Sequence, residues 1–214
     1  MLLRHRSPEI DTAPVTPAAG LEYLQQEWLT VLRWLNSSRV DYVLIGPVAH
    51  AIRGELTSRG PVGIVPAPYL RNYERLAAAL TDQGATLRSE RPLRGADPRT
   101  EMRLDAEKLA HGRRWLLHFC GHDLDVESSK LSPASPPAPG SQATGGPAGD
   151  GARYQELLYE AMRVEVAEGL SVQVASPEDL ELYSHMRRTG VAPEFRITRA
   201  GAGAELPAGQ RSDS

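Results

Sequence analysis

Carboxylates and a histidine–cysteine cluster share one short stretch in the middle of the chain. His118, Cys120 and His122 alternate, and Asp123 and Asp125 follow in the segment HDLDV. Carboxylate oxygens suit Mg²⁺, and alternating histidine and cysteine suit zinc. On an unbroken strand the first three side chains would share a face, but a glycine between them interrupts the alternation. We therefore expect structural histidines instead of a zinc site, and we keep the two aspartates as candidates.

A glycine turn is the second feature with chemical potential. Gly46 and Pro47 end the apolar run DYVLI, and a short apolar segment closed by Gly54 follows. Backbone N–H groups in such a turn can approach a phosphate closely. Proline has no N–H to donate, which weakens this turn as a phosphate cradle.

Composition and charge narrow the class of protein. The chain has 214 residues, a formal charge of −3 and a single cysteine, so no internal disulfide can form. The near-neutral balance disfavours a generic nucleic-acid coat, although arginine-rich stretches such as 88–94 leave RNA open as a less favoured partner. No apolar run approaches the ~20 residues of a membrane span, and the first residues lack a signal-peptide pattern. We expect a cytoplasmic protein with no membrane partner.

Glycine and proline divide the chain into ordered and unordered parts. The chain has 19 glycines and 17 prolines, many of them in a few segments. Residues 1–20 and 191–214 are predicted to be disordered tails, because they offer too little apolar surface to offset the entropy of ordering. Residues 131–152 are predicted to be a flexible insertion. One domain over residues 21–190 remains.

The elements of that domain alternate between helix and strand. Helical periodicity marks residues 21–35, and apolar runs or alternation mark strands. The predicted strands cover 41–45, 62–65, 85–88, 115–119, 124–126, 163–166 and 172–174, and the predicted helices cover 21–35, 48–53, 73–80, 154–161 and a last one that begins at 176. Ser176 suits the N-cap of that last helix. The expected class is α/β (α+β), a mixed sheet flanked by helices.

Several of these segments carry a shared pattern. It comprises the strand, glycine turn and small helix from Tyr42 to Gly54, a second strand ending at Pro66, the Asn72-x-x-Arg75-Leu helix, the segment Leu124-Asp125-Val126, and Val174-Ala-Ser-Pro-Glu-Asp179-Leu180. In this order and spacing the chain resembles the nucleotidyltransferase superfamily, in its minimal-nucleotidyltransferase and AbiEii-toxin-like branch. The resemblance covers about residues 21–188, with the insertion left out.

The resemblance implies a particular chemistry. In the family, an Asp-x-Asp pair on the second strand and a third Asp on a neighbouring strand hold Mg²⁺. The metal ions polarise the α-phosphate of a nucleoside triphosphate and activate the attacking hydroxyl. The glycine turn approaches the triphosphate. By the same resemblance Gly46, Pro47 and Arg59 are the candidate nucleotide-binding residues, and a member of this branch could belong to a toxin–antitoxin pair.

The chain departs from the family pattern at the positions of the metal ligands. Pro61 and Gly63 stand where the family has its Asp pair. Neither has a side-chain oxygen, and Asp125 alone remains of the triad, with Asp123 as a weaker candidate. One carboxylate is not expected to hold two Mg²⁺ ions, so most of the electrostatic stabilisation of transfer would be lost. As a relic, Asp125 is expected to cap a turn or to pair with Arg53 or Arg59.

Three functional hypotheses follow. The first is a pseudoenzyme with this fold that needs no metal or cofactor and acts by binding a nucleotide or a protein partner. The second is an active, toxin-like enzyme that uses Mg²⁺ and a nucleoside triphosphate to modify tRNA or protein, with Glu55, Asp123 and Asp125 as relocated carboxylates. The third is a structural interaction module whose cleft is filled by side chains.

Overall fold

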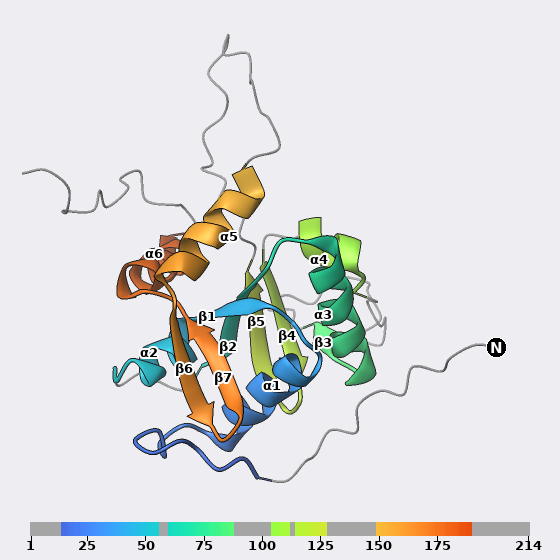
Figure 1. Cartoon of the computed structure of the whole chain (residues 1–214). Helices are drawn as coiled ribbons and strands as arrows, with labels where there is room; N and C mark the ends of the chain where they lie inside the picture. The colour runs from blue at the N-terminus through green and yellow to red at the C-terminus, as the bar shows by residue number, and fades with distance from the viewer. Residues whose placement is uncertain (1–13, 56–59, 88–103, 112–113, 128–148, 190–214) are drawn as a thin grey trace, which may run out of the picture.

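The computed structural model describes residues 14–55, 60–87, 104–111, 114–127 and 149–189. Over these residues the chain is an α/β fold in which helices flank a seven-stranded mixed sheet (Figure 1). The helices are α1 Gln26–Ser37, α2 Gly46–Ile52, α3 Leu70–Asp82, α4 Ala106–His111, α5 Gly149–Glu160 and α6 Pro177–Thr189. The strands are β1 Tyr42–Ile45, β2 Val62–Pro66, β3 Thr86–Leu87, β4 Arg114–Phe119, β5 His122–Glu127, β6 Met162–Ala167 and β7 Leu170–Val174.

The sheet has the order β3-β4-β5-β2-β1-β7-β6. Its centre mixes directions, because β2 is antiparallel to β1 and parallel to β5, while β1 is parallel to β7. The flanks are two antiparallel hairpins, β4–β5 and β6–β7. The expected mixed sheet with flanking helices is confirmed.

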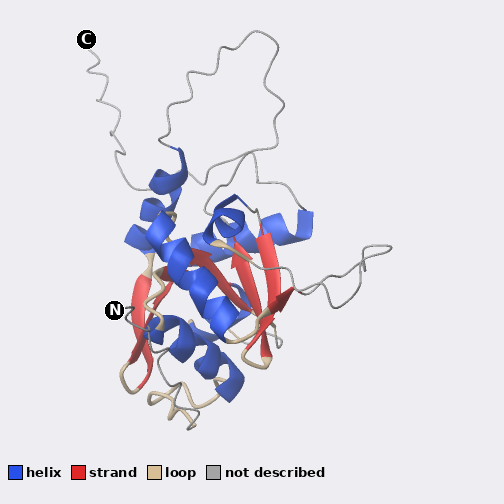
Figure 2. Cartoon of the chain, turned by 90° about the vertical axis from the view of Figure 1, so that its right-hand side faces the viewer, coloured by secondary structure: helices blue, strands red, loops and turns tan. Residues whose placement is uncertain are grey.

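The central strands are buried because helices cover both of their faces. Every residue of β1 and β2 is buried, as expected of short continuous apolar runs. On one face α1 packs on the sheet, with Trp34 in an edge-to-face contact with Phe119 at a ring-centroid distance of 4.8 Å. The short helix α2 contacts β1 and β2, and α6 contacts α2. Figure 2 shows the strands in red with the helices packed around them.

The packed part of the chain includes residues that lie before the expected domain boundary at residue 21. Val15 is buried, and its backbone N–H and C=O are both hydrogen-bonded to the side-chain amide of Gln26. Pro17 pairs with Ala167 at the edge of β6. Residues 14–20 therefore contact the sheet, whereas residues 1–13, 128–148 and 190–214, where the rest of the tails and most of the insertion were expected, lie outside the described residues.

The Asn72-x-x-Arg75 pattern has a structural role. Asn72 is fully buried, accepts a hydrogen bond from the Asp41 N–H at 2.8 Å and donates to the carbonyls of Asp41 and Ala67. Arg75 donates to the Arg39 carbonyl at 2.9 Å. The two side chains hold the N-terminal half of α3 against the chain that enters β1, so this motif positions β1. The side-chain amide of Asn72 makes all of its hydrogen bonds within the protein.

The last helix begins as expected. The Ser176 hydroxyl accepts a hydrogen bond from the Asp179 N–H at 3.1 Å and donates to the Asp179 carboxylate at 2.9 Å. This reciprocal cap fixes the start of α6. The Arg53 guanidinium also donates to the Ala175 carbonyl at 2.7 Å, which ties the end of α2 to the entry of α6. The direction in which α6 leaves the sheet is thereby set.

Candidate functional site

Gly63 and Asp125 lie side by side in the sheet. In the parallel pairing of β2 with β5, Gly63 is the partner of Asp125. Paired residues on adjacent strands face the same side of a sheet, so a side chain at position 63 would point to the face that carries Asp125. Pro61 comes directly before β2. Gly63 and Asp125, two of the positions that the sequence singled out, are therefore neighbours in space.

Asp125 is fully buried and is held by two arginines. Arg114, on the neighbouring strand β4, makes a two-pronged contact, with Nε 2.9 Å from Oδ1 and Nη2 2.7 Å from Oδ2. Arg187, on α6, places its Nη2 3.2 Å from Oδ2. This second contact is an ion pair that is not aligned as a hydrogen bond. A buried carboxylate needs such partners, because transfer of an unpaired charge from water to the protein interior costs much free energy.

Glu127 is a second buried carboxylate in the same place. Its Oε1 lies 2.6 Å from the Arg187 Nε and 4.0 Å from the Arg114 Nε. Two arginines and two carboxylates thus form one charge-balanced group. We call Arg114, Asp125, Glu127 and Arg187 the arginine–carboxylate cluster.

Burial has the largest effect on the pKa of Glu127. The loss of water around its carboxyl raises the pKa, and the negative charge of Asp125 raises it further. Arg187, by its charge and its hydrogen bond, and then Arg114 lower the pKa without cancelling the effect of burial. The second carboxyl of the cluster is therefore harder to ionise than a free glutamate.

Two glycines leave space for the Arg187 guanidinium. A β-carbon built on Gly46 would lie 2.6 Å from the Arg187 Nη1, and one built on Gly63 would lie 2.9 Å from Nη2. Gly46 also has a φ of +70°, which side-chain-bearing residues rarely adopt. The guanidinium therefore rests directly against the backbone of the glycine turn and of β2. It fills the volume in which side chains at positions 46 and 63 would begin.

The expectation that Asp125 pairs with Arg53 or Arg59 is wrong for Arg53. The Arg53 Nε donates to a backbone carbonyl at the entry of α6, 2.7 Å away, and Arg114 and Arg187 occupy the Asp125 carboxylate. Arg59 lies outside the described residues. Pro47 follows Gly46 in the first turn of α2, where a missing N–H costs nothing.

The other candidate carboxylates have partners of their own. Asp123 lies 3.3 Å from the His118 Nδ1 across the β4–β5 hairpin. Glu55 lies 2.7 Å from the His50 Nδ1, and its side chain is 54% exposed. Each of these acids thus contacts a histidine, and the carboxylate that shares partners with Asp125 is Glu127.

The histidine–cysteine segment is split between two surroundings. His118 pairs with Asp123, whereas the His122 Nε2 lies 3.0 Å from the Trp28 indole nitrogen of α1. Cys120 has a φ of 51° in the turn between the two strands, and burial raises the pKa of its thiol to about 11. Within the described part of the chain, no three His, Cys, Asp or Glu side chains gather as they would around a metal ion.

Sequence reasoning missed three members of the cluster: Arg114, Glu127 and Arg187. The period-two pattern of Asp123, Asp125 and Glu127 could have indicated that Glu127 shares a face with Asp125. Arg114 lies directly opposite Glu127 in the hairpin register, a relation that depends on the length of the turn. Only the placement of α6 brings Arg187 to them.

Comparisons with known proteins leave the site unassigned. The sequence matches no protein-family model, and no curated protein matches it. None of the helices in the described ranges is both long and apolar enough to cross a membrane.

Proposed function

We propose that this chain is a nucleotidyltransferase-fold protein that has lost metal-dependent catalysis and acts by binding a nucleotide or a partner protein. One observation carries the proposal: the Arg187 guanidinium occupies the space beside Asp125 in which a carboxylate at position 63 would begin. The order and spacing of the sequence motifs support the fold assignment. The pairing of Gly63 with Asp125, which the resemblance requires, supports it as well.

The residues present do not fit a two-metal centre. Such a centre needs several carboxylate oxygens with free lone pairs around each ion. Asp125 already accepts from Arg114 on both oxygens, and Glu127 is engaged by Arg187. An incoming Mg²⁺ would have to displace the guanidinium of Arg187, whose side chain is only 19% exposed. We therefore derive no catalytic step through a metal.

The cluster instead gives the scaffold a permanent internal cation. Together the two guanidinium groups balance the two carboxylates without the hydration and geometry that a magnesium ion demands. Arg187 also joins α6 to β5 through its contacts with Asp125 and Glu127. A binding role is consistent with that arrangement, and the single, half-buried cysteine is consistent with a reducing, cytoplasmic location.

A transfer assay tests the loss of catalysis. The protein is incubated with each α-labelled nucleoside triphosphate and Mg²⁺, alone and with tRNA or a protein extract, and label on any acceptor is measured. We expect none above a heat-inactivated control. Robust transfer that Asp125→Ala abolishes would overturn the proposal and would favour the active, toxin-like enzyme.

The Arg187 side chain beside Gly46 and Gly63 favours one other candidate, a purely structural module. Thermal unfolding with ATP, with and without Mg²⁺, separates the two. A ligand present at 100 times its Kd stabilises a protein by about 2.7 kcal/mol, a shift that melting curves resolve. A concentration-dependent rise in melting temperature supports a binding protein, and unchanged curves up to millimolar ATP together with no bound nucleotide support the structural module.

A further inference from the structure

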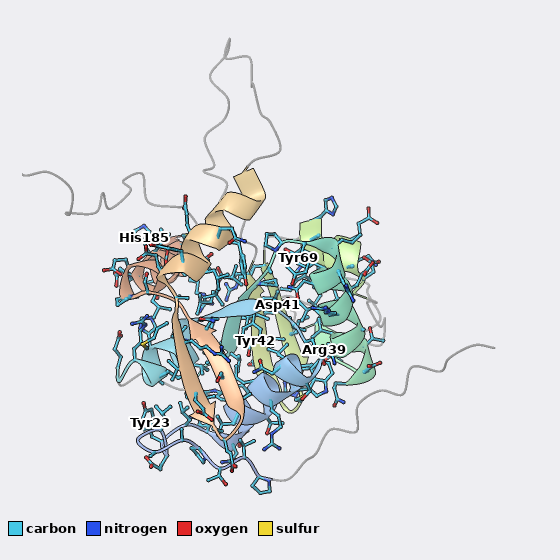
Figure 3. The ribbon with its side chains drawn as sticks, viewed as in Figure 1. Tyr23, Arg39, Asp41, Tyr42, Tyr69 and His185 are labelled. Carbon is cyan, nitrogen blue, oxygen red and sulfur yellow. The ribbon has the colours of Figure 1, made fainter. Side chains whose placement is uncertain are left out.

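A cavity of about 530 Å³ opens at the start of β1. This volume lies within the range of roughly 300–1,000 Å³ that is usual for small-molecule sites. We call it the tyrosine groove. The residues that define it are Arg39, Asp41, Tyr42, Tyr69, Tyr154 and Arg163. Figure 3 shows Arg39, Asp41, Tyr42 and Tyr69 around the chain that enters β1.

The tyrosine groove is separate from the arginine–carboxylate cluster. The groove includes Tyr42, the first residue of β1, whereas the cluster rests on Gly46, which follows the last residue of that strand. No residue of the cluster lines the groove. An inference about the groove therefore stands independently of the proposed function.

Three tyrosines give the groove fixed aromatic walls. The Tyr42 hydroxyl donates to the Asn36 side-chain oxygen at 2.9 Å, and the Asn36 amide donates to the Ser171 carbonyl at 2.8 Å. The Tyr69 hydroxyl donates to the Asp41 carboxylate, yet Tyr69 remains 44% exposed. Tyr42 and Tyr154 are 6% and 4% exposed, so the aromatic face that a ligand can reach is the ring of Tyr69. An aromatic ring held by a hydrogen bond, as that of Tyr69 is, can receive a planar ring with little loss of side-chain entropy.

The charged groups of the groove leave it with an excess of positive charge. Arg39 and Arg163 line it, and neither guanidinium makes an ion pair with a described residue. The only carboxylate among the lining residues, that of Asp41, lies 3.4 Å from the Arg75 guanidinium and accepts from Tyr69. The two lining arginines therefore remain available for an anion, although the whole chain has a formal charge of −3.

The backbone at Arg39 is unusual for an arginine. Arg39 has a φ of 56° and follows the C-cap of α1, where the Ser38, Arg39 and Val40 N–H groups close the helix end on carbonyls of its last turns. Glycine is the residue most often found at this position, because any β-carbon is strained there. An arginine in a glycine position points to a use for its side chain, and that side chain lines the groove.

We propose that the tyrosine groove binds a nucleoside monophosphate, with the base against the ring of Tyr69 and the phosphate on Arg39 and Arg163. Guanidinium groups match phosphate oxygens in two-pronged hydrogen bonds, and tyrosine rings stack on nucleobases. Gln155, Ser171 and Gln173 also line the groove and supply polar groups for the edge of the base or for the ribose.

Calorimetric titration tests this proposal with the full chain. AMP, GMP, CMP and UMP are each titrated, with adenosine and inorganic phosphate as the two half-ligands. We expect at least one monophosphate to bind with a Kd below about 1 mM, and each half-ligand to bind at least tenfold more weakly. The test variants are Arg39→Gly and Arg163→Gln, and Arg188→Gln on α6 is the matched control, because Arg188 is 69% exposed and lies outside the groove.

Arg39→Gly separates binding from folding. Glycine relieves the strained backbone, so the variant is expected to unfold at the same or higher urea concentration than the parent protein. Because a charge-assisted contact is lost, its affinity for the monophosphate is expected to fall about tenfold or more, as is that of Arg163→Gln. Arg188→Gln keeps the parent affinity.

Three results would overturn the proposal. No detectable binding of any of the four monophosphates at 5 mM would exclude this ligand class. If adenosine bound as tightly as AMP, the arginines would not hold the phosphate. If inorganic phosphate bound as tightly as any monophosphate, the aromatic wall would not hold the base. Unchanged affinity in Arg39→Gly and Arg163→Gln would place the ligand elsewhere on the protein.

Discussion

The guanidinium of Arg187 lies where a side chain at position 63 would begin. A β-carbon on Gly63 would be 2.9 Å from the Arg187 Nη2 and 2.8 Å from the Ile45 carbonyl oxygen. The Arg187 cation therefore fits beside β2 because Gly63 has no side chain. Asp125, the partner of Gly63 in the sheet, lies 3.2 Å from that cation, measured from its Oδ2 to the Arg187 Nη2.

Replacing Gly63 tests how tightly this space is filled. Gly63→Ala should destabilise the protein by about 1–3 kcal/mol, as overpacking of a filled interior does. The Ile45 carbonyl belongs to the backbone and can move little, so shortening Arg187 relieves only part of the conflict. Urea denaturation measures the change. Gly169→Ala is a control for backbone strain without crowding, since Gly169 has a φ of +67° and no atom within 4 Å of its β-carbon position. Equal stability of Gly63→Ala and the parent would contradict the packing described.

The same contact limits how a metal site could be rebuilt. Aspartate at positions 61 and 63, with glycine at 47, would restore the pattern of the sequence family. The structure adds a requirement, because Arg187 must also be shortened before a carboxylate at 63 has room. Restoration without a change at Arg187 is therefore expected to give an unstable protein and no Mg²⁺ binding.

Removing Arg187 should be costly. Arg187→Ala leaves Asp125 and Glu127 with Arg114 as their remaining partner in the cluster, and breaking a buried ion pair from one side typically costs about 3–5 kcal/mol. Arg188→Ala is the matched control. Its guanidinium is 69% exposed and 3.8 Å from Glu181, so its loss should change stability by less than about 1 kcal/mol. The free energies of unfolding come from urea titrations, and similar values for the two variants would contradict a buried cluster.

The raised pKa of Glu127 predicts a pH dependence of stability. The folded protein binds a proton at Glu127 more tightly than the unfolded chain, whose glutamates titrate near 4.5. Stability contributed by this proton is present below pH 4.5 and is lost as pH rises through the folded pKa. Glu127→Gln cannot titrate, so the free energy of unfolding of the parent should fall relative to this variant as pH rises from 4 to 7. A difference between the two proteins that is constant with pH, or that runs the other way, would contradict the dominance of burial.

The Cys120 thiol should be slow to react. Burial raises its pKa from 9.0 to about 11. Its thiolate fraction at pH 8 is then about a hundredfold below that of an ordinary thiol, since each unit of pKa changes it tenfold. Alkylation by iodoacetamide, followed by mass spectrometry, should be at least that much slower than in the urea-unfolded protein and should keep rising with pH beyond 9. Rapid labelling at pH 7 would indicate a reactive cysteine and a different environment at the β4–β5 turn.

The sequence carried enough information for the sheet and for part of the site. Short apolar runs placed β1 and β2, and two apolar segments that meet at Gly121 placed β4 and β5. Period-two alternation placed the β6–β7 hairpin, and Ser176 as an N-cap placed the start of α6. These signals are local, because each depends on a few neighbouring residues. The resemblance, and not these local signals, put Asp125 on a strand next to that of Gly63, and the structure adds that the two strands pair in parallel.

The filling of the site could not be predicted in this way. Arg187 reaches Gly63 across more than 120 residues of sequence, and its contact depends on the direction of α6 and on a side chain with several rotatable bonds. At the end of a helix an arginine also has an ordinary explanation, the favourable interaction with the helix dipole. The tyrosine groove could not be predicted for a similar reason, because its six defining residues come from five separate elements and connections.

Mn²⁺ binding is the sharpest test of whether the site has lost its metal ions, because this ion uses the same oxygen ligands as Mg²⁺ and is detected by its electron paramagnetic resonance signal. We expect the parent protein to bind no Mn²⁺ at concentrations up to 1 mM, since Arg114 and Arg187 already balance Asp125 and Glu127. Tight binding of one or two Mn²⁺ ions by the parent protein, lost in Asp125→Asn, would contradict this expectation.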